Sequence, residues 1–329
     1  MRLLVLGGSG FVGRAVVGEA QARGYQVTVF NRGRRAMPAE VVALVGDRLT
    51  GEGLAALGAG TWDAVVDTWS GDPAAVRSAA AVLKGRAGHY TYVSSRSVYA
   101  EGAAAPLTEQ SPVVDPDTDF VYAAHKRGGE IAAEQEFDGA VLLARAGLIL
   151  GPHEDVGRLP WWLNRLRRGG PALAPGPREL PLQYIDARDL AVFLLDAAGR
   201  GLGGAYNVVS EAGHTTMGEL LETANAVTGG RADLRWTAAQ VILEAGIEPW
   251  TQLPIWLPPG PDHDFMHRGD VAKVLAAGLR ARPVGETVAD TWAWLQELGG
   301  TPPHRPDRPP VGLDPVKEAA VLGSAPGEY

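Results

Sequence analysis

The sequence predicts an α/β protein in which a doubly wound parallel sheet is followed by a smaller, helix-rich C-terminal part. Short apolar or β-branched segments, typical of buried strands, alternate with segments of helical periodicity as far as residue 150. Strands that alternate with helices through short connections form parallel sheets. Beyond Gly151 the alternation stops, and loops rich in Gly and Pro separate segments that are mostly helical.

Composition bounds the kind of protein and its partners. The 329 residues are 46% hydrophobic and 21% charged, which is typical of a globular protein, and the formal net charge is -8. That charge gives no general attraction to nucleic acid or anionic membranes, so we expect neither as a partner. Cysteine is absent, which excludes disulfides, thiol nucleophiles and Cys-ligated metals and fits a cytoplasmic protein. The oligomeric state stays open.

A βαβ unit opens the chain. Its strand, helix and second strand are expected at Leu3–Leu6, Phe11–Arg23 and Gln26–Phe30. Between strand and helix, Gly7 permits a tight turn, Gly10 lets backbone N–H groups approach a pyrophosphate, and Gly13 lets the helix pack closely on the sheet. The turn therefore predicts a Rossmann-type dinucleotide site. We assign its contacts to Gly7, Ser9, Gly10, Phe11, Val12 and Gly13.

The other elements follow in order. Further strands are expected at 41–45, 64–66, 89–93 and 140–145, and helices at roughly 51–58, 73–83 and 120–135. In the second half, helices are expected at 188–198, 216–227, 238–245 and 284–298, and one strand at 206–209. The segment Gly169–Pro177 is expected to be a loop, Thr301–Pro310 an extended arm, and Asp314 the N-cap of a short final helix.

These elements predict three regions. Residues 1–150 form a dinucleotide-binding domain, to which segments near 183–210 return. Residues 151–182 and 211–300 form a substrate-binding cap, and residues 301–329 form the Pro-rich arm with its helix. We therefore expect a small-molecule substrate.

The end of the second strand bears on the choice between NAD and NADP. An acidic residue there would accept hydrogen bonds from a ribose hydroxyl. The chain instead reads Asn31-Arg32-Gly33-Arg34-Arg35, with three arginines and no acid. Arg32 is expected to lie over the adenine and bind the 2′-phosphate, with Arg34 or Arg35 as a second contact and Asn31 among the contacts. NADP(H) is favoured and NAD(H) is not excluded, and a solvated basic turn is the alternative.

A tyrosine and a lysine four residues apart are the main catalytic candidates. Tyr122 and Lys126 lie on a segment expected to be helical, so their side chains project from one face, one turn apart. The chain has 8 Tyr and only four Lys, which makes this spacing rare by chance. An ammonium near a phenol lowers the phenol pKa, as a general acid/base near neutral pH requires. The alternative is a pair that merely shares a surface.

Hydroxyl groups follow the strand expected at 89–93. Ser95 lies beyond its carboxyl end, on the side where ligands bind to parallel sheets. It is the candidate that hydrogen-bonds a substrate carbonyl and holds it against Tyr122. A serine-rich turn that caps the loop is the alternative.

Together these motifs resemble the extended short-chain dehydrogenase/reductase superfamily, in the branch of epimerase/dehydratase-like and reductase-like enzymes. The resemblance covers nearly the whole chain. Its matches are the glycine turn, Val93–Tyr99, the pair Tyr122 and Lys126, Arg145–Pro152 and Gln183–Asp189.

The resemblance implies roles for single residues. Tyr122 would donate or accept the proton, Lys126 would hold the nicotinamide ribose and depress the pKa of Tyr122, and Ser95 would polarise the carbonyl. Asp47 matches the acid that contacts the adenine ring. The expected cofactor contacts beyond the glycine turn and the basic segment are Asp47, Arg48, Thr68 and Lys126.

Two departures from the family pattern bear on the substrate. Nucleotide-sugar members carry Asn where this chain has Leu148, and an aliphatic residue there resembles reductases of apolar carbonyl compounds. A small Ala-Ala pair is common after the fourth strand, whereas this chain has Asp67-Thr68-Trp69. Trp69 is either a ligand-stacking or a packing residue. The expected substrate contacts are Trp69, Arg96, Leu148 and Trp161.

These observations favour an NADP-dependent oxidoreductase that reduces a carbonyl, or oxidises the alcohol, of a small non-sugar metabolite. The several Trp residues of the cap fit an aromatic one. The first alternative is an NAD-dependent nucleotide-sugar epimerase or dehydratase. The second is a nucleotide-sensing or RNA-binding relative without enzymatic activity.

Two polar clusters are given structural roles. Asp262-His263-Asp264 and His267 are expected to be solvated residues of a cap loop, so no metal site is predicted. The arginines of the segment Arg165–Arg168 are expected to form a solvated helix face.

Overall fold

The computed structural model describes residues 1–34 and 40–324, which divide into two compact units. Unit 1 comprises Met1–Gly147, Ala187–Val209 and Gly269–Arg280. Unit 2 comprises Leu148–Asp186, Ser210–Arg268 and the described residues that follow Arg280. The segment Gly269–Arg280 thus belongs to unit 1, whereas the sequence analysis assigned it to the cap.

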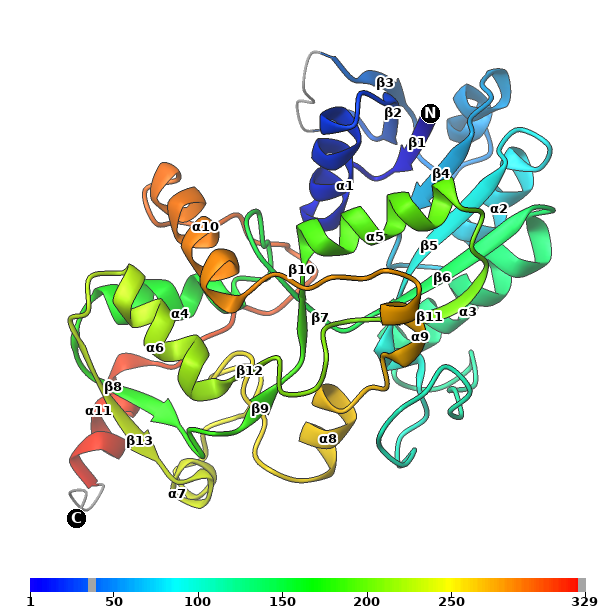
Figure 1. Cartoon of the computed structure of the whole chain (residues 1–329). Coiled ribbons are helices and arrows are strands. Elements are labelled where there is room, and N and C mark those ends of the chain that lie inside the picture. The colour runs from blue at the N-terminus through cyan, green and yellow to red at the C-terminus, as the bar shows by residue number, and fades with distance from the viewer. Residues whose placement is uncertain (35–39, 325–329) are drawn as a thin grey trace. The chain divides into compact units, whose positions relative to one another are not determined.

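A seven-stranded parallel sheet forms the centre of unit 1 (Figure 1). Its strands lie in the order β11-β6-β5-β4-β1-β2-β3. Their bounds are β1 Arg2–Leu6, β2 Gln26–Asn31, β3 Val42–Val45, β4 Ala64–Asp67, β5 His89–Ser95, β6 Ala140–Ala146 and β11 Gly204–Val208. The winding direction reverses between β1 and β4, and the carboxyl ends of strands at such a point form the usual ligand crevice of this architecture. The predicted doubly wound parallel sheet is confirmed.

Helices cover both faces of this sheet (Figure 1). They are α1 Phe11–Ala22, α2 Ala74–Leu83, α3 Val121–Glu136, α5 Ala187–Gly199 and α9 Ala272–Ala276, with short 3-10 helices at Glu52–Ala59 (η1) and Arg96–Val98 (η2). Helix α1 packs beside α5, and α2 packs beside α3. Because both faces are covered, the central strand segment Leu3–Leu6 is wholly apolar and buried.

Unit 2 has more residues in helices than in strands, and its described residues form three pairs of strands. Its helices are α4 Arg158–Arg167, α6 Met217–Val227, α7 Ala239–Glu244, α8 Pro261–His267, α10 Val284–Glu297 and α11 Pro315–Ser324. Its strands are β7 Leu148–Leu150, β8 Gly170–Pro175, β9 Pro181–Leu182, β10 Tyr184–Asp186, β12 Thr215–Thr216 and β13 Ala232–Thr237. Strands β7 and β10 pair in parallel, as do β8 and β13, while β9 and β12 pair antiparallel.

Strand β8 corrects the loop expected over Gly169–Pro177. The segment pairs along its length with β13, which sequence periodicity did not indicate. Its centre, Ala172–Ala174, is completely or almost completely buried. Burial of this apolar centre decides the conformation, and proline is tolerated because Pro171 and Pro175 lie near the ends of the strand.

Arg165 is also corrected, from a solvated residue to a buried one. Its Nε donates to Glu318 Oε2 of α11 at 2.7 Å, and both side chains are almost fully buried. Glu318 Oε1 further accepts a hydrogen bond from Leu173 N at 3.1 Å. The ion pair therefore ties the C-terminal helix to α4 and to the edge of β8.

The histidine cluster is a third correction. His263 and His267 lie on α8 and are buried rather than solvated. His263 Nε2 lies 2.8 Å from Pro181 O, and His267 Nδ1 accepts a hydrogen bond from Gln183 N at 3.1 Å. These contacts give the imidazoles a structural role. Among the described residues, no group of three or more His, Cys, Asp or Glu side chains is arranged to hold a metal ion.

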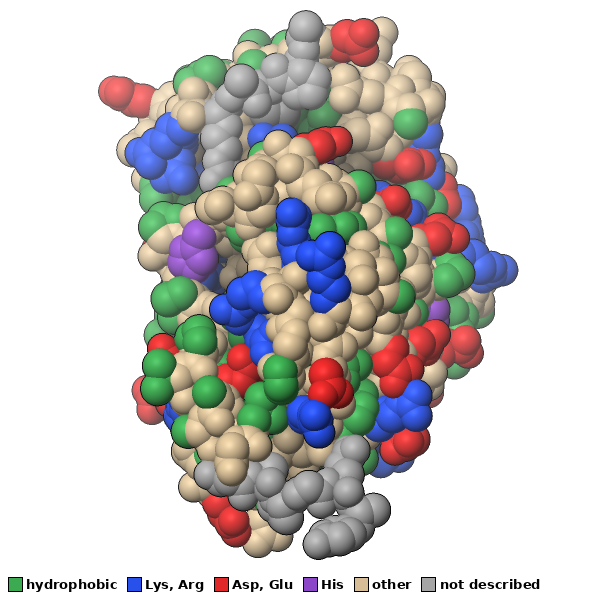
Figure 2. Space-filling view, turned by 90° about the vertical axis from the view of Figure 1, so that its left-hand side faces the viewer, with side chains coloured by type: hydrophobic (Ala, Val, Ile, Leu, Met, Phe, Trp, Pro, Cys, Tyr) green, Lys and Arg blue, Asp and Glu red, His purple; other side chains and the backbone are tan. Residues whose placement is uncertain are grey.

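The surface mixes charges of both signs. On the face that Figure 2 presents, several Lys and Arg side chains gather near the centre, Asp and Glu side chains lie mostly around them, and hydrophobic side chains are scattered among both. Of the helices described for residues 1–34 and 40–324, none is long and apolar enough to cross a membrane.

Candidate active site

The glycine turn after β1 forms a cradle that side chains would fill. A Cβ on Gly7, where φ is +127°, would lie 2.2 Å from Thr68 Oγ1, and a Cβ on Gly13 would lie 2.5 Å from Gly8 N. A Cβ on Gly10 would meet nothing within 4 Å. Gly10 is also the N-cap of α1, without a side-chain hydrogen bond to the first turn. The turn therefore fits the pyrophosphate of a dinucleotide, which helix N-termini bind through backbone N–H groups.

The side chains around this turn are exposed enough to contact a bound dinucleotide. Ser9, Phe11 and Val12 are half-buried. Arg14 is exposed, and its Nε donates to Ser9 O at 3.2 Å. Arg14 was not among the sequence candidates, and the signal that indicates it is a cation one residue after Gly13, in the first turn of α1.

The basic segment follows β2. Asn31 Oδ1 accepts a hydrogen bond from Gly33 N at 2.7 Å, so Asn31 shapes the turn through its side chain. Arg32 and Arg34 are exposed. Arg35 lies outside the described residues. Asp47, after β3, is half-buried, and its Oδ1 accepts from Leu49 N at 3.0 Å.

Arg48 lies in a buried ion pair. Its Nη1 and Nη2 donate to the two carboxylate oxygens of Asp67, each at 2.7 Å, and Nη2 also donates to Ala75 O at 3.0 Å. Tyr90 OH donates to Asp67 Oδ2 at 2.6 Å. Burial alone would raise the pKa of Asp67, but the Arg48 guanidinium and these hydrogen bonds hold it below its usual value. We therefore remove Arg48 from the expected cofactor contacts, because its guanidinium is committed within the protein.

Helix α3 places Tyr122 and Lys126 one turn apart at the carboxyl ends of β4 and β5. Lys126 is only 3% exposed, and its Nζ donates to Trp69 O and to Val93 O, each at 2.6 Å. The ammonium also lies 4.9 Å from the centre of the Tyr92 ring. Tyr122 is half-buried, and its ring centre lies 6.5 Å from that of Phe120. The lysine is thus held on the same edge of the sheet as the glycine turn.

The two serines at the end of β5 have different surroundings. Ser94 is buried, and its hydroxyl donates to Glu130 Oε1 at 2.8 Å. Ser95 is half-buried, and its Oγ accepts from Ser97 N at 3.1 Å and lies 3.2 Å from Ser97 Oγ. Ser95 also caps η2, so the cap expected as an alternative is present together with a hydroxyl at the strand end.

Glu130, which is absent from the sequence candidates, holds the carboxyl ends of β5 and β6 together through hydrogen bonds. It lies one turn after Lys126 on α3 and is completely buried. Arg145 of β6 donates to it through Nε at 2.9 Å and Nη2 at 3.1 Å, and Arg127 donates at 3.0 Å. Glu130 therefore joins α3 to β5 and β6. The missed signal is its spacing of four residues from Lys126, which puts it on the same helix face.

Two expected substrate contacts are packing residues of unit 2. Leu148 is 4% exposed and lies in the hydrophobic core of that unit. Trp161 packs edge-on against Trp162, with ring centres 4.7 Å apart, and a Cβ on Gly312 would lie 2.0 Å from its indole nitrogen. Leu148 is thus withdrawn because core packing buries it. Trp161 is only half-buried, so its contact with a substrate stays a prediction.

Arg96 is also buried, at 3% exposure. A Cβ on Gly269 would lie 2.7 Å from its Cζ, so the guanidinium packs against the returning segment of unit 1. Burial lowers the pKa of Arg96 to about 10, and the neighbouring Tyr99 opposes that shift. An arginine packed in this way is a poor surface contact for a substrate, so this expectation is withdrawn as well.

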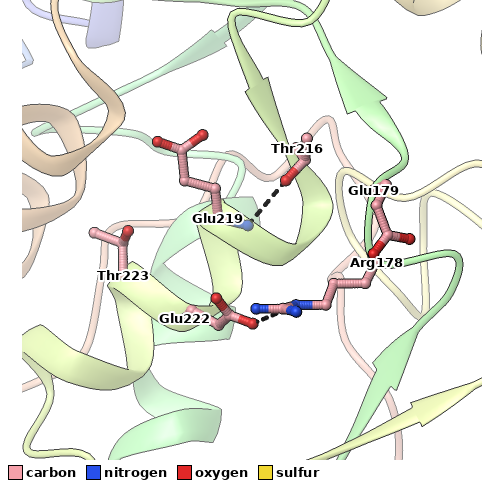
Figure 3. Close-up of a pocket in the computed structure, with 6 residues that line it drawn as sticks. All are labelled: Arg178, Glu179, Thr216, Glu219, Glu222 and Thr223. Atoms are coloured by element: carbon pink, nitrogen blue, oxygen red, sulfur yellow. Dashed lines mark hydrogen bonds and ion pairs between the residues drawn. The ribbon is translucent and has the colours of Figure 1, made fainter.

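Unit 2 contains a cavity of about 290 Å³ that does not match the candidate site. It is lined by Arg178, Glu179, Thr216, Glu219, Glu222 and Thr223. Figure 3 shows Arg178 and Glu222 pointing toward each other, and their ion pair measures 2.6 Å. The Thr216 hydroxyl caps α6 by accepting from Glu219 N at 3.1 Å. The cavity is lined by three carboxylates and one arginine, so its net negative charge does not favour a phosphate-bearing ligand.

Comparisons with known proteins agree with this geometry. The family model described as Epimerase, NAD dependent epimerase/dehydratase family, matches residues 3–208. A search of the curated proteins gives no significant match.

Solved structures share the fold at low identity. The Bordetella bronchiseptica enzyme WbmH in complex with NAD+ is 18% identical with a TM-score of 0.68, over 91% of this chain and 99% of that one. UDP-glucose 4-epimerase of Thermotoga maritima with UDP-glucose is 16% identical with a TM-score of 0.71, over 91% and 99%. UDP-N-acetylglucosamine 4-epimerase of Bacillus cereus is 16% identical with a TM-score of 0.67, over 90% and 99%.

The matched segment contains the glycine turn, Ser95, Tyr122 and Lys126, and it covers more than half of the chain. The resemblance to extended short-chain dehydrogenase/reductase enzymes is confirmed, and the chain belongs to the NAD dependent epimerase/dehydratase family.

Proposed function

We propose that this protein is an epimerase or dehydratase that oxidises a secondary alcohol of a nucleotide-linked sugar, with NAD(H) as its resident cofactor. The placement of Lys126 carries the proposal. Its ammonium is held by carbonyl groups at the ends of β4 and β5, one helical turn from Tyr122 and on the sheet edge that bears the glycine turn. This arrangement suits proton transfer next to a bound dinucleotide. The substrate class rests on the family match and on the sugar nucleotide bound in the Thermotoga maritima structure.

The chain's own residues would supply proton transfer and orientation. Tyr122 would accept the proton of the substrate hydroxyl, and Lys126 would lie one helical turn away, beside the bound dinucleotide. The Ser95 hydroxyl hydrogen-bonds the same substrate oxygen. The glycine turn and Thr68 would hold the cofactor, which when bound would supply the acceptor for the hydride of the alcohol carbon and would return that hydride later in the same turnover.

The expected non-sugar reductase is less well supported than this alternative. Its main sequence argument was Leu148, and this side chain lies in the core of unit 2, where it has no bearing on substrate choice. One observation still favours a reductase that uses NADP(H). Arg32 and Arg34 are exposed next to the end of β2, where a 2′-phosphate would be recognised.

Cofactor retention and product analysis test the two functions. The purified protein would be denatured, and the released nucleotide identified by mass spectrometry. Incubation with UDP-glucose and UDP-N-acetylglucosamine should give an altered sugar, observed by proton NMR, with no net change in absorbance from NADH. Stoichiometric consumption of added NADPH with a carbonyl substrate, and no reaction of any sugar nucleotide, would favour the reductase. In that case Arg32→Ala should weaken NADPH binding much more than NADH binding.

A further inference from the structure

We infer that Trp69 is a positioning residue for Lys126, and that the buried ion pair of Arg48 and Asp67 fixes Trp69 in place. The inference rests on the proposed function, because Lys126 matters only if it serves a dinucleotide site. It assigns Trp69 a task other than stacking on a substrate.

The backbone of Trp69 is held on both sides. Its N–H donates to Asp67 Oδ1 at 3.0 Å, and its carbonyl oxygen accepts from Lys126 Nζ at 2.6 Å. The indole Nε1 donates to Asp72 O at 2.9 Å, which closes the loop that follows β4. The position of the carbonyl that receives Lys126 is therefore set by the Asp67 carboxylate and by the indole.

The indole is itself packed on a charged group. The Arg48 guanidinium carbon lies 5.0 Å from the centre of the Trp69 ring, in cation–π geometry. A Cβ on Gly71 would lie 3.2 Å from the same ring, so the loop backbone follows the indole closely. One face of the indole is thus used by Arg48, which makes Trp69 a poor stacking platform for a ligand.

The ion pair of Arg48 and Asp67, on which the indole packs, has little freedom to move. Asp67 is completely buried and accepts from both Nη atoms of Arg48 and from Tyr90 OH. Charged groups buried in this way keep their partners, because separation would leave a charge without solvation. A rigid carboxylate holds the Trp69 N–H, and the Trp69 carbonyl then fixes one of the two backbone contacts of Lys126. The second contact, Val93 O, belongs to the sheet itself.

Lysine NMR tests the inference without any activity. The chain has only four lysines, Lys84, Lys126, Lys273 and Lys317, so a sample labelled with 15N at the side-chain nitrogen gives few signals. Lys126→Arg identifies the signal of Lys126. In Trp69→Ala we expect this signal to move and its ammonium protons to exchange with water at least roughly tenfold faster, while the other three signals stay in place. A Lys126 signal that is unchanged in Trp69→Ala overturns the inference.

Further variants separate positioning from general disruption. Trp69→Phe keeps a ring over Arg48 but loses the bond to Asp72 O, so it should show a smaller change in the same direction. Tyr90→Phe removes one donor from Asp67 and serves if the alanine variant does not fold. Trp62→Phe is the matched control, because this indole lies in the same hydrophobic cluster but packs on Gly60. An equal change in Trp62→Phe would also overturn the inference.

Kinetics and binding then distinguish the inference from the proposed function. In an active protein, Trp69→Ala should lower kcat with little change in substrate KM, since the Lys126 ammonium beside the reacting group is no longer fixed. A rise in substrate KM alone, with kcat unchanged, identifies Trp69 as a stacking residue and overturns the inference. If wild-type protein binds neither NAD(H) nor NADP(H) but the Lys126 signal moves in Trp69→Ala, the proposed function fails and the positioning role stands.

Discussion

A buried carboxyl in unit 2 should make the stability of this protein depend on pH. Glu154 is completely buried and caps α4, since its carboxylate accepts from Arg158 N at 2.7 Å and Leu159 N at 3.1 Å. Burial raises its pKa from 4.5 to about 7, although the backbone donors and the Arg158 charge favour ionisation. A raised folded-state pKa means that the folded protein binds the proton more tightly than the unfolded chain. The stabilisation is therefore complete below pH 4.5 and is lost as the pH rises to about 7.

The magnitude follows from the two pKa values. One pH unit corresponds to roughly 1.4 kcal/mol, so Glu154 should remove about 3 kcal/mol of unfolding free energy across this range. Glu154→Gln cannot ionise and should lack this loss. Urea unfolding followed by Trp fluorescence, which comes mostly from unit 2, would give the difference between wild type and variant at each pH.

The control for this experiment is Glu179→Gln, which changes an exposed glutamate of the same unit. It should leave the pH dependence as in the wild type. The free energies of unfolding of wild type and Glu154→Gln should differ by different amounts at pH 4.5 and at about pH 8. If they differ by the same amount at both, the raised pKa does not belong to Glu154.

Three further predictions concern catalysis, stability and cofactor binding. Tyr122→Phe should lower kcat by roughly 10²- to 10⁴-fold while dinucleotide binding, measured by calorimetry, is kept; unchanged turnover would exclude Tyr122 as the residue that takes the substrate proton. Glu318→Ala leaves a buried arginine without its partner and should cost about 3–5 kcal/mol in chemical denaturation, and a loss below about 1 kcal/mol would contradict this role. Gly7→Ala should abolish dinucleotide binding because its Cβ would lie 2.2 Å from Thr68 Oγ1, whereas Gly18→Ala, where a Cβ meets nothing within 4 Å, should bind normally.

Local patterns were sufficient for most of unit 1, but not for its segment Gly269–Arg280, which the sequence placed in the cap. Its strands and helices follow from alternating periodicity, and the glycine turn, Ser95, Tyr122 and Lys126 could be named from spacing and family resemblance. Each of these signals lies within one turn or one strand end. These features can be predicted from sequence because the residues that form each of them are neighbours in the chain.

Long-range packing was not readable in the same way. Arg48 and Asp67 become partners because the loop after β3 brings Arg48 to the end of β4, although two other strands lie between β3 and β4 in the sheet. Leu148 resembled a substrate contact, yet packing in the core of unit 2 buries it. The same holds for β8, whose prolines indicated a loop until its pairing with β13 was seen.

The sequence by itself determined that this chain has a doubly wound parallel sheet, a dinucleotide turn and a Tyr–Lys pair, because each is encoded by periodicity or fixed spacing. The tertiary structure alone decided which polar side chains are available to ligands and which are committed to the protein. Availability depends on burial and on partners brought from elsewhere in the chain. That is why Arg48, Arg96 and Leu148 left the list of contacts, and why Trp69 became a support for Lys126.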